Sequence, residues 1–129
     1  MWWKKNKYGA TRVEKAGRRY DSKSESALHD LLLLEEKAGL IKNIRQQQTI
    51  YLTEARIGMR PDFTVWDKEF NQDVFAEFKG FETDAWLIKL KLYRVYGDRP
   101  MKIYRGTPKN VYLAETVLPK FWKEGKHDN

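Results

Sequence analysis

The chain has 129 residues, 33% of them charged, no cysteine and a net charge of +7. This length suits one hydrophobic core rather than two, so we expect a single domain. The lack of cysteine excludes disulfides and thiolate metal sites, and no apolar run is long enough for a membrane span or a signal-peptide core, so we expect a cytoplasmic protein with no membrane partner.

A basic arm, residues 1–19, precedes the predicted domain at residues 20–129. The arm contains seven basic residues and one glutamate, so it carries +6 of the net charge of +7. Such charges, with Trp2, Trp3 and Tyr8 between them, suit contact with DNA phosphates and stacking on bases, although a solvated tail is the alternative. The candidate DNA-binding residues of the arm are Lys4, Lys5, Lys7, Arg12, Arg18 and Arg19.

The first predicted helix begins near Ser22 and ends at Gly39, a helix-stopping residue. Glu25 has two interpretations. It completes a capping box with Ser22, and it also shares the helix face of the apolar stripe, from which its carboxylate could reach a metal. His29, one turn further, either packs as a polar residue or lies behind the metal ligands. The apolar positions expected to face the sheet are Leu28, Leu31, Leu32 and Leu34.

Two extended segments follow the first helix. Residues 42–52 are rich in β-branched and aromatic side chains, which predicts one strand, with Gln47 on the face of Arg45, Thr49 and Tyr51. After a turn at residues 53–58, a second strand opens on Pro61 and Asp62. Its side chains alternate, so Phe63 and Val65 share one face of the strand.

A third strand carries Glu77, Phe78 and Lys79, and alternation places Glu77 and Lys79 on the same face. A hairpin turn at residues 67–72 would place Asp62 opposite Glu77 and Arg60 opposite Lys79. Opposed carboxylates destabilise a sheet unless a cation lies between them. The sequence therefore predicts a magnesium site formed by Asp62, Glu77 and the backbone carbonyl of Phe78.

The remaining segments complete the fold. Thr83 and Asp84 begin a second helix that ends at Gly97 and carries Lys89 and Lys91, which are either solvated or in contact with phosphates. We expect a last short strand at residues 100–105. We expect a helical segment at residues 111–122, broken at Pro119. The order helix, three strands, helix, strand predicts an α/β protein with a mixed sheet flanked by helices.

These motifs resemble those of the PD-(D/E)xK nucleases of restriction-endonuclease-like αβββαβ fold. Residues 20–94 more narrowly resemble the bacteriophage endonuclease I group of Holliday-junction resolvases and related small phage proteins, through the phrases around Glu25, Asp62 and Glu77. Transposon-end nucleases share a similar helix, a glutamine near Gln47 and the Pro-Asp motif, and this resemblance implies that Gln47 supports the metal ligands. The resemblance implies that Glu25, Asp62 and Glu77 are acidic metal ligands and that Lys79 is the catalytic lysine.

The function implied is Mg²⁺-dependent hydrolysis of DNA phosphodiesters, with Mn²⁺ able to substitute. The expected substrate is branched duplex DNA, and the resemblance suggests a homodimer with two sites. Two alternatives stay open: a basic DNA-binding module without catalysis, in which Asp62, Glu77 and Lys79 form a structural ion cluster, and an end-processing or transposon-end-type nuclease on the same core.

Overall fold

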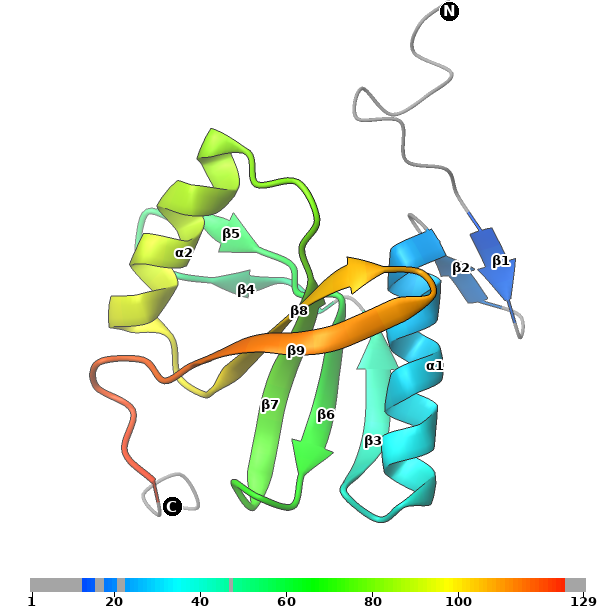
Figure 1. Cartoon of the computed structure of the whole chain (residues 1–129). Helices are drawn as coiled ribbons and strands as arrows, with labels where there is room; N and C mark the ends of the chain where they lie inside the picture. The colour runs from blue at the N-terminus through cyan, green and yellow to red at the C-terminus, as the bar shows by residue number, and fades with distance from the viewer. Residues whose placement is uncertain (1–12, 16–17, 21–22, 47, 125–129) are drawn as a thin grey trace, which may run out of the picture.

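The computed structural model of the protein describes residues 13–15, 18–20, 23–46 and 48–124, the first two stretches by their backbone alone. Its centre is a five-stranded sheet in the order β3-β6-β7-β8-β9 (Figure 1). Neighbouring strands of this sheet are antiparallel except β7 and β8, which are parallel. The strands are β3 (Ile41–Gln46), β6 (Phe63–Asp67), β7 (Gln72–Phe78), β8 (Met101–Thr107) and β9 (Asn110–Val117).

Two helices cover opposite faces of the sheet. Helix α1 (Lys23–Lys37) buries Leu28 and Leu32 against one face, in a core shared with Phe63, Val65, Val74 and Ala76. Helix α2 (Asp84–Tyr96) buries Trp86, Leu90 and Tyr93 against the other face, in a core shared with Phe75, Met101, Ile103 and Val117. Because both faces are covered, the middle strands are almost wholly buried. No helix in the described part of the chain has the length and apolar composition needed to cross a bilayer.

The order α1, β3, β6, β7, α2, β8 confirms the predicted α/β arrangement with a mixed sheet. The predicted helix ends are also confirmed. Helix α1 ends at Lys37, and Gly39 follows with φ of +81°, a conformation that glycine adopts readily. Helix α2 is capped by Thr83, whose hydroxyl accepts a hydrogen bond from the backbone N–H of Trp86 at 3.0 Å.

The single strand predicted for residues 42–52 is wrong. Strand β3 ends at Gln46, and Ile50–Tyr51 forms β4, which pairs with β5 (Gly58–Met59) in a separate two-stranded sheet. This hairpin contributes Leu52 and Met59 to the core under α2, whereas β3 lies beside β6. The predicted strand is therefore divided in two, because its first half pairs with β6 and its second half packs under α2.

Two smaller predictions are also wrong. Residues 110–117 are strand β9 rather than the start of a helical piece, because they pair with β8 along its whole length. Leu34 is 65% exposed, since it lies on the side of α1 away from Leu28 and Leu32. The two-stranded sheet of β1 (Val13–Lys15) and β2 (Arg18–Tyr20) begins in the predicted arm and ends one residue beyond it.

Candidate functional site

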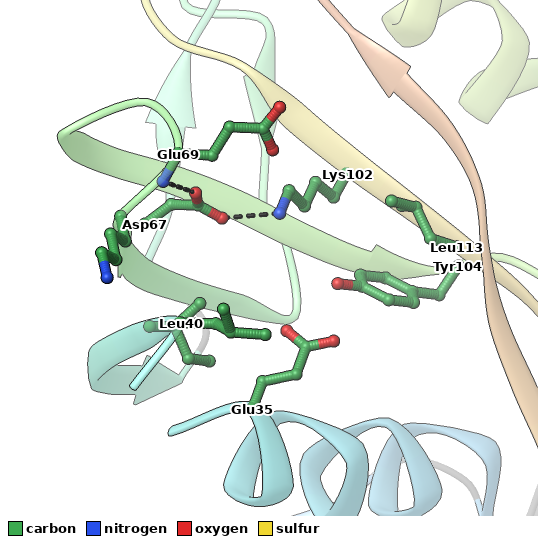
Figure 2. Close-up of a pocket in the computed structure, with 9 residues that line it drawn as sticks. Glu35, Leu40, Asp67, Glu69, Lys102, Tyr104 and Leu113 are labelled. Atoms are coloured by element: carbon green, nitrogen blue, oxygen red, sulfur yellow. Dashed lines mark hydrogen bonds and ion pairs between the residues drawn. The ribbon is translucent and has the colours of Figure 1, made fainter. Parts of the chain in front are cut away.

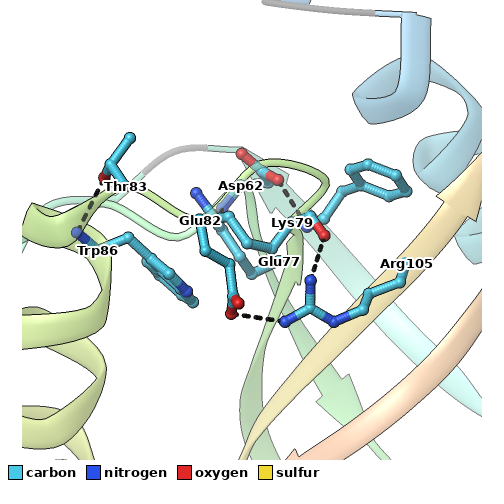
Figure 3. Close-up of polar contacts among 8 residues, drawn as sticks. Asp62, Glu77, Lys79, Glu82, Thr83, Trp86 and Arg105 are labelled. Carbon is cyan, nitrogen blue, oxygen red and sulfur yellow. Dashed lines mark hydrogen bonds and ion pairs between the residues drawn. The ribbon is translucent and has the colours of Figure 1, made fainter.

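Asp62 and Glu77 lie opposite each other at one end of the central strands β6 and β7, as the predicted hairpin requires. Strands β6 and β7 pair Phe63 with Ala76, so Asp62, just before β6, comes next to Glu77. The backbone N–H of Asp62 donates to Oε1 of Glu77 at 2.9 Å, and the backbone N–H of Phe78 donates to Oδ2 of Asp62 at 2.8 Å (Figure 3). Backbone groups of the two strands therefore orient both carboxylates.

The surroundings of these two carboxylates disfavour their negative charge. Burial raises the pKa of Asp62 well above its ordinary value, and the charges of Glu77 and Glu25 raise it further. Burial also raises the pKa of Glu77, against the opposing effect of Lys79. Acids with raised pKa values cluster at functional sites, where a cation or a proton relieves their repulsion.

Glu25 approaches the site from the opposite face of the sheet. It lies in the first turn of α1 and is only 4% exposed, and the N-terminal end of α1 lies at the same end of the sheet as the end of β7 (Figure 1). Its charge acts on Asp62 and contributes to the raised pKa of that residue. The alternative capping role involves Ser22, which lies outside the described residues.

Lys79 extends the site towards α2. Its ammonium lies 3.1 Å from Oε2 of Glu77 and 4.3 Å from the centre of the Trp86 ring. Trp86 is held in place by the Thr83 cap of α2. A carboxylate and an aromatic face together restrain a side chain that would otherwise be flexible.

Arg105 of β8 supports the backbone at Lys79. One guanidinium nitrogen donates to the carbonyl oxygen of Lys79 at 2.9 Å, and another pairs with Glu82 at 2.7 Å (Figure 3). The backbone N–H of Lys79 in turn donates to the carbonyl of Tyr104 at 2.9 Å. Both partners come from β8, so the parallel pairing of β7 with β8 completes the site.

A depression of about 290 Å³ opens beside these groups. Its lining includes Glu77 and Trp86 together with three basic residues, Arg60, Lys79 and Lys89. Lys91 is exposed and does not line the depression, because residues two apart on a helix point in nearly opposite directions. The geometry combines buried acids with a basic wall, an arrangement that suits a phosphate group.

The described residues include no group of three or more His, Cys, Asp or Glu side chains placed to hold a metal ion. The acids in direct contact with the site's backbone are two, Asp62 and Glu77. Hard oxygen donors in this number fit Mg²⁺, which is commonly held by one or two carboxylates together with water and substrate phosphates.

A family profile described as "Protein of unknown function (DUF1064)" matches residues 5–107. The chain belongs to the DUF1064 family. No curated protein matches the chain, and no solved structure matches it. The DUF1064 region contains both helices, β8 and every residue of the depression, whereas β9 follows it.

The other predicted site residues have various positions. The imidazole of His29 is stacked on the ring of Phe63 with centroids 5.4 Å apart, and the residue is 4% exposed, so it packs in the core. Phe78 contributes its N–H to Asp62, and its carbonyl remains a predicted ligand. Gln47, Lys4, Lys5, Lys7 and Arg12 lie outside the described residues, and Arg18 and Arg19 lie on β2, whose backbone alone is described.

Sequence reasoning missed three residues of the site. Arg60 could have been predicted as a site residue, because the predicted strand register already placed it opposite Lys79. Trp86 lies at an apolar position of the second helix, and its spacing there indicates only packing against the sheet. Arg105 had no signal, since its contact with Lys79 depends on the parallel pairing of strands separated by a helix.

Proposed function

We propose that this protein is a metal-dependent endonuclease that hydrolyses phosphodiesters of branched DNA. The observation that carries the proposal is the pair Asp62 and Glu77, which lie at the end of two central strands with Lys79 beside Glu77. The order α1, β3, β6, β7, α2, β8 supports a restriction-endonuclease-like core, in which these positions hold the reactive groups.

Asp62 and Glu77 would hold Mg²⁺ or Mn²⁺, with the carbonyl of Phe78 as a backbone ligand, and Glu25, whose charge acts on Asp62, would be the third acid of the site. When bound, the cation would supply positive charge that stabilises the negative charge developing on the attacked phosphate. Burial raises the pKa of both Asp62 and Glu77, and the charges of Glu77 and Glu25 raise that of Asp62 further. A bound cation would stabilise both carboxylates in their charged form, which supports this assignment.

The other residues of the depression would bind and orient the substrate. The ammonium of Lys79, restrained by Glu77 and Trp86, would orient the attacking water and donate to an oxygen of the scissile phosphate. Hydrolysis forms a bond from the water oxygen to phosphorus and breaks one ester P–O bond. Arg60 and Lys89 would hold the neighbouring phosphates, and the basic arm would follow the DNA backbone.

The substrate and assembly follow from the resemblance to junction-resolving nucleases. A four-way junction presents two related strands for cutting, so a homodimer with two sites fits it. The net charge of +7 favours a polyanionic substrate and predicts binding that weakens as salt is added.

The first test is cleavage of a labelled four-way junction and of a linear duplex of the same sequence, each with Mg²⁺, Mn²⁺ or EDTA. Wild type should cut the junction only with a metal, and Glu77→Gln and Lys79→Met should each reduce the rate by about 100-fold or more. Equal cutting of both substrates would retain the nuclease and reject the junction preference. Cuts confined to strand ends would favour an end-processing enzyme.

A binding assay separates the nuclease from a non-catalytic DNA-binding module. Tight binding with no metal-dependent product, unaffected by Asp62→Asn, would replace the proposed enzyme with the binder. Lys89→Met should lower the slope of log affinity against log salt by about 1, as expected for the loss of one phosphate contact. Lys91→Met removes the same charge on the other side of α2 and should leave the slope unchanged.

A further inference from the structure

A second cavity lies at the other end of β6 from Asp62, between the C-terminal half of α1 and the strands β8 and β9 (Figure 2). Its volume is about 480 Å³, within the range of about 300–1,000 Å³ that holds small organic ligands. The lining combines apolar residues with ionisable ones, and we call this space the Tyr104 cavity. The residues that line it include Glu35, Leu40, Ile41, Lys102, Tyr104 and Leu113.

A buried ion pair forms one wall of the Tyr104 cavity. The ammonium of Lys102 lies 2.6 Å from Oδ2 of Asp67, and Oδ1 of Asp67 accepts the backbone N–H of Glu69 at 2.8 Å. The Asp67 side chain is 3% exposed and that of Lys102 is 13% exposed. The charges of this pair cancel each other, so the wall does not attract an anion strongly.

The hydroxyl of Tyr104 points into the same space and has no hydrogen-bond partner among the described residues (Figure 2). Tyr104 is only 2% exposed. The Tyr104 ring is buried, whereas its hydroxyl oxygen faces the open space of the cavity. The hydroxyl is therefore within reach of a hydrogen-bonding group that enters the cavity.

The carboxylate of Glu35 also points towards this space from α1, as Figure 2 shows. No described residue donates a hydrogen bond to it or forms an ion pair with it, and partial burial raises its pKa. The exposed rim residues Lys68 and Glu69 carry opposite charges. Glu35 consequently has no direct partner among the described residues, and the lining cation whose charge lowers its pKa, Lys102, is already paired with Asp67.

We propose that the Tyr104 cavity binds a small organic cation of the amidinium or guanidinium type. Its charged end would donate to the carboxylate of Glu35 and to the oxygen of Tyr104, and its apolar body would lie between Leu40, Ile41 and Leu113. A metal ion fits poorly, because one free carboxylate and one hydroxyl supply too few oxygen ligands. This site is independent of the proposed nuclease, since none of its residues lines the depression beside Glu77.

The probe is benzamidinium, with benzamide as its neutral equivalent of nearly the same shape. Each is titrated into ¹⁵N-labelled protein, and amide shifts of Tyr104, Leu113 and Leu40 are followed by two-dimensional NMR. Benzamidinium should give saturable shifts at these residues, and benzamide should bind about tenfold more weakly because it lacks the charge that pairs with Glu35. Glu35→Gln should weaken benzamidinium binding to a similar extent.

Two further variants make the result specific. Glu36→Gln removes the same charge from the exposed neighbour of Glu35 and should leave the affinity unchanged. Tyr104→Phe should weaken binding by about threefold to tenfold, the loss expected for one hydrogen bond. The proposal is overturned if benzamidinium gives no saturable shifts, if benzamide binds equally well, or if Glu35→Gln and Glu36→Gln have equal effects.

Discussion

The backbone N–H of Asp62 donates a hydrogen bond to the side chain of Glu77 at 2.9 Å, across two antiparallel strands. A second bond runs the other way, from the N–H of Phe78 to the carboxylate of Asp62. The sheet itself therefore brings two carboxylates together and keeps them close. Their repulsion is built into the fold, and several measurements can detect it.

Stability should depend on pH through Asp62. The raised pKa means that the folded protein holds this proton more tightly than the unfolded chain, whose ordinary value is 3.8. The resulting stabilisation is fully present below pH 3.8 and is lost as the pH rises through the raised pKa of the folded protein. Its size is about 1.4 kcal/mol for each tenfold difference in proton affinity between the folded and unfolded states. In EDTA, Asp62→Asn should therefore become more stable relative to wild type as pH rises from about 4 to about 8.

Urea denaturation at a series of pH values measures this difference. Asparagine keeps an oxygen acceptor for the N–H of Phe78, so the substitution removes the charge and retains the bond. Glu54→Gln, in an exposed turn, is the matched control and should show no such trend. A constant difference between Asp62→Asn and wild type over the whole range would contradict the prediction.

Magnesium should stabilise the folded protein. A ligand that binds only the folded state, at about 100 times its dissociation constant, adds about 2.7 kcal/mol to the free energy of unfolding. Thermal unfolding should therefore shift upwards with Mg²⁺ in wild type, and Asp62→Asn and Glu77→Gln should lose most of the shift. Lys79→Met should keep the shift, because its ammonium repels a cation. An equal response of all four proteins would show that the ion acts elsewhere.

Loss of the α2 cap should destabilise the protein. Thr83→Ala removes the acceptor for the N–H of Trp86 and should lower the free energy of unfolding by about 1 kcal/mol. Thr83→Ser restores the hydroxyl and should recover most of this loss. Chemical denaturation provides the measurement, and equal stabilities of the alanine and serine variants would exclude the capping role.

Two glycines with positive φ should respond differently to alanine. Gly106, near the end of β8, has φ of +113°, and a Cβ there would lie 2.0 Å from the carbonyl oxygen of Asn110, the first residue of β9. Gly39 has φ of +81° and open space around the same position. Gly39→Ala should cost about 1 kcal/mol from backbone strain alone. Gly106→Ala should cost at least about 1 kcal/mol more, because the turn must also move; equal losses would contradict this.

The sequence alone determined the features that depend on neighbouring residues. The end of α1 at Gly39, the cap at Thr83 and the register that brings Asp62 to Glu77 all follow from local hydrogen bonding, turn residues and strand alternation. Asp62, Glu77 and Lys79 could therefore be grouped before the fold was known.

Tertiary structure decided what depends on distant partners. Residues 110–117 have a composition that allows helix or strand, and pairing with β8 selects the strand. The break between β3 and β4 follows from packing against two different surfaces, and Lys89 rather than Lys91 lines the depression because α2 has one orientation on the sheet. Arg105 and the Tyr104 cavity arise only after β8 crosses over to lie beside β7. Contacts between such remote segments depend on the packing of the whole chain, which no local pattern encodes.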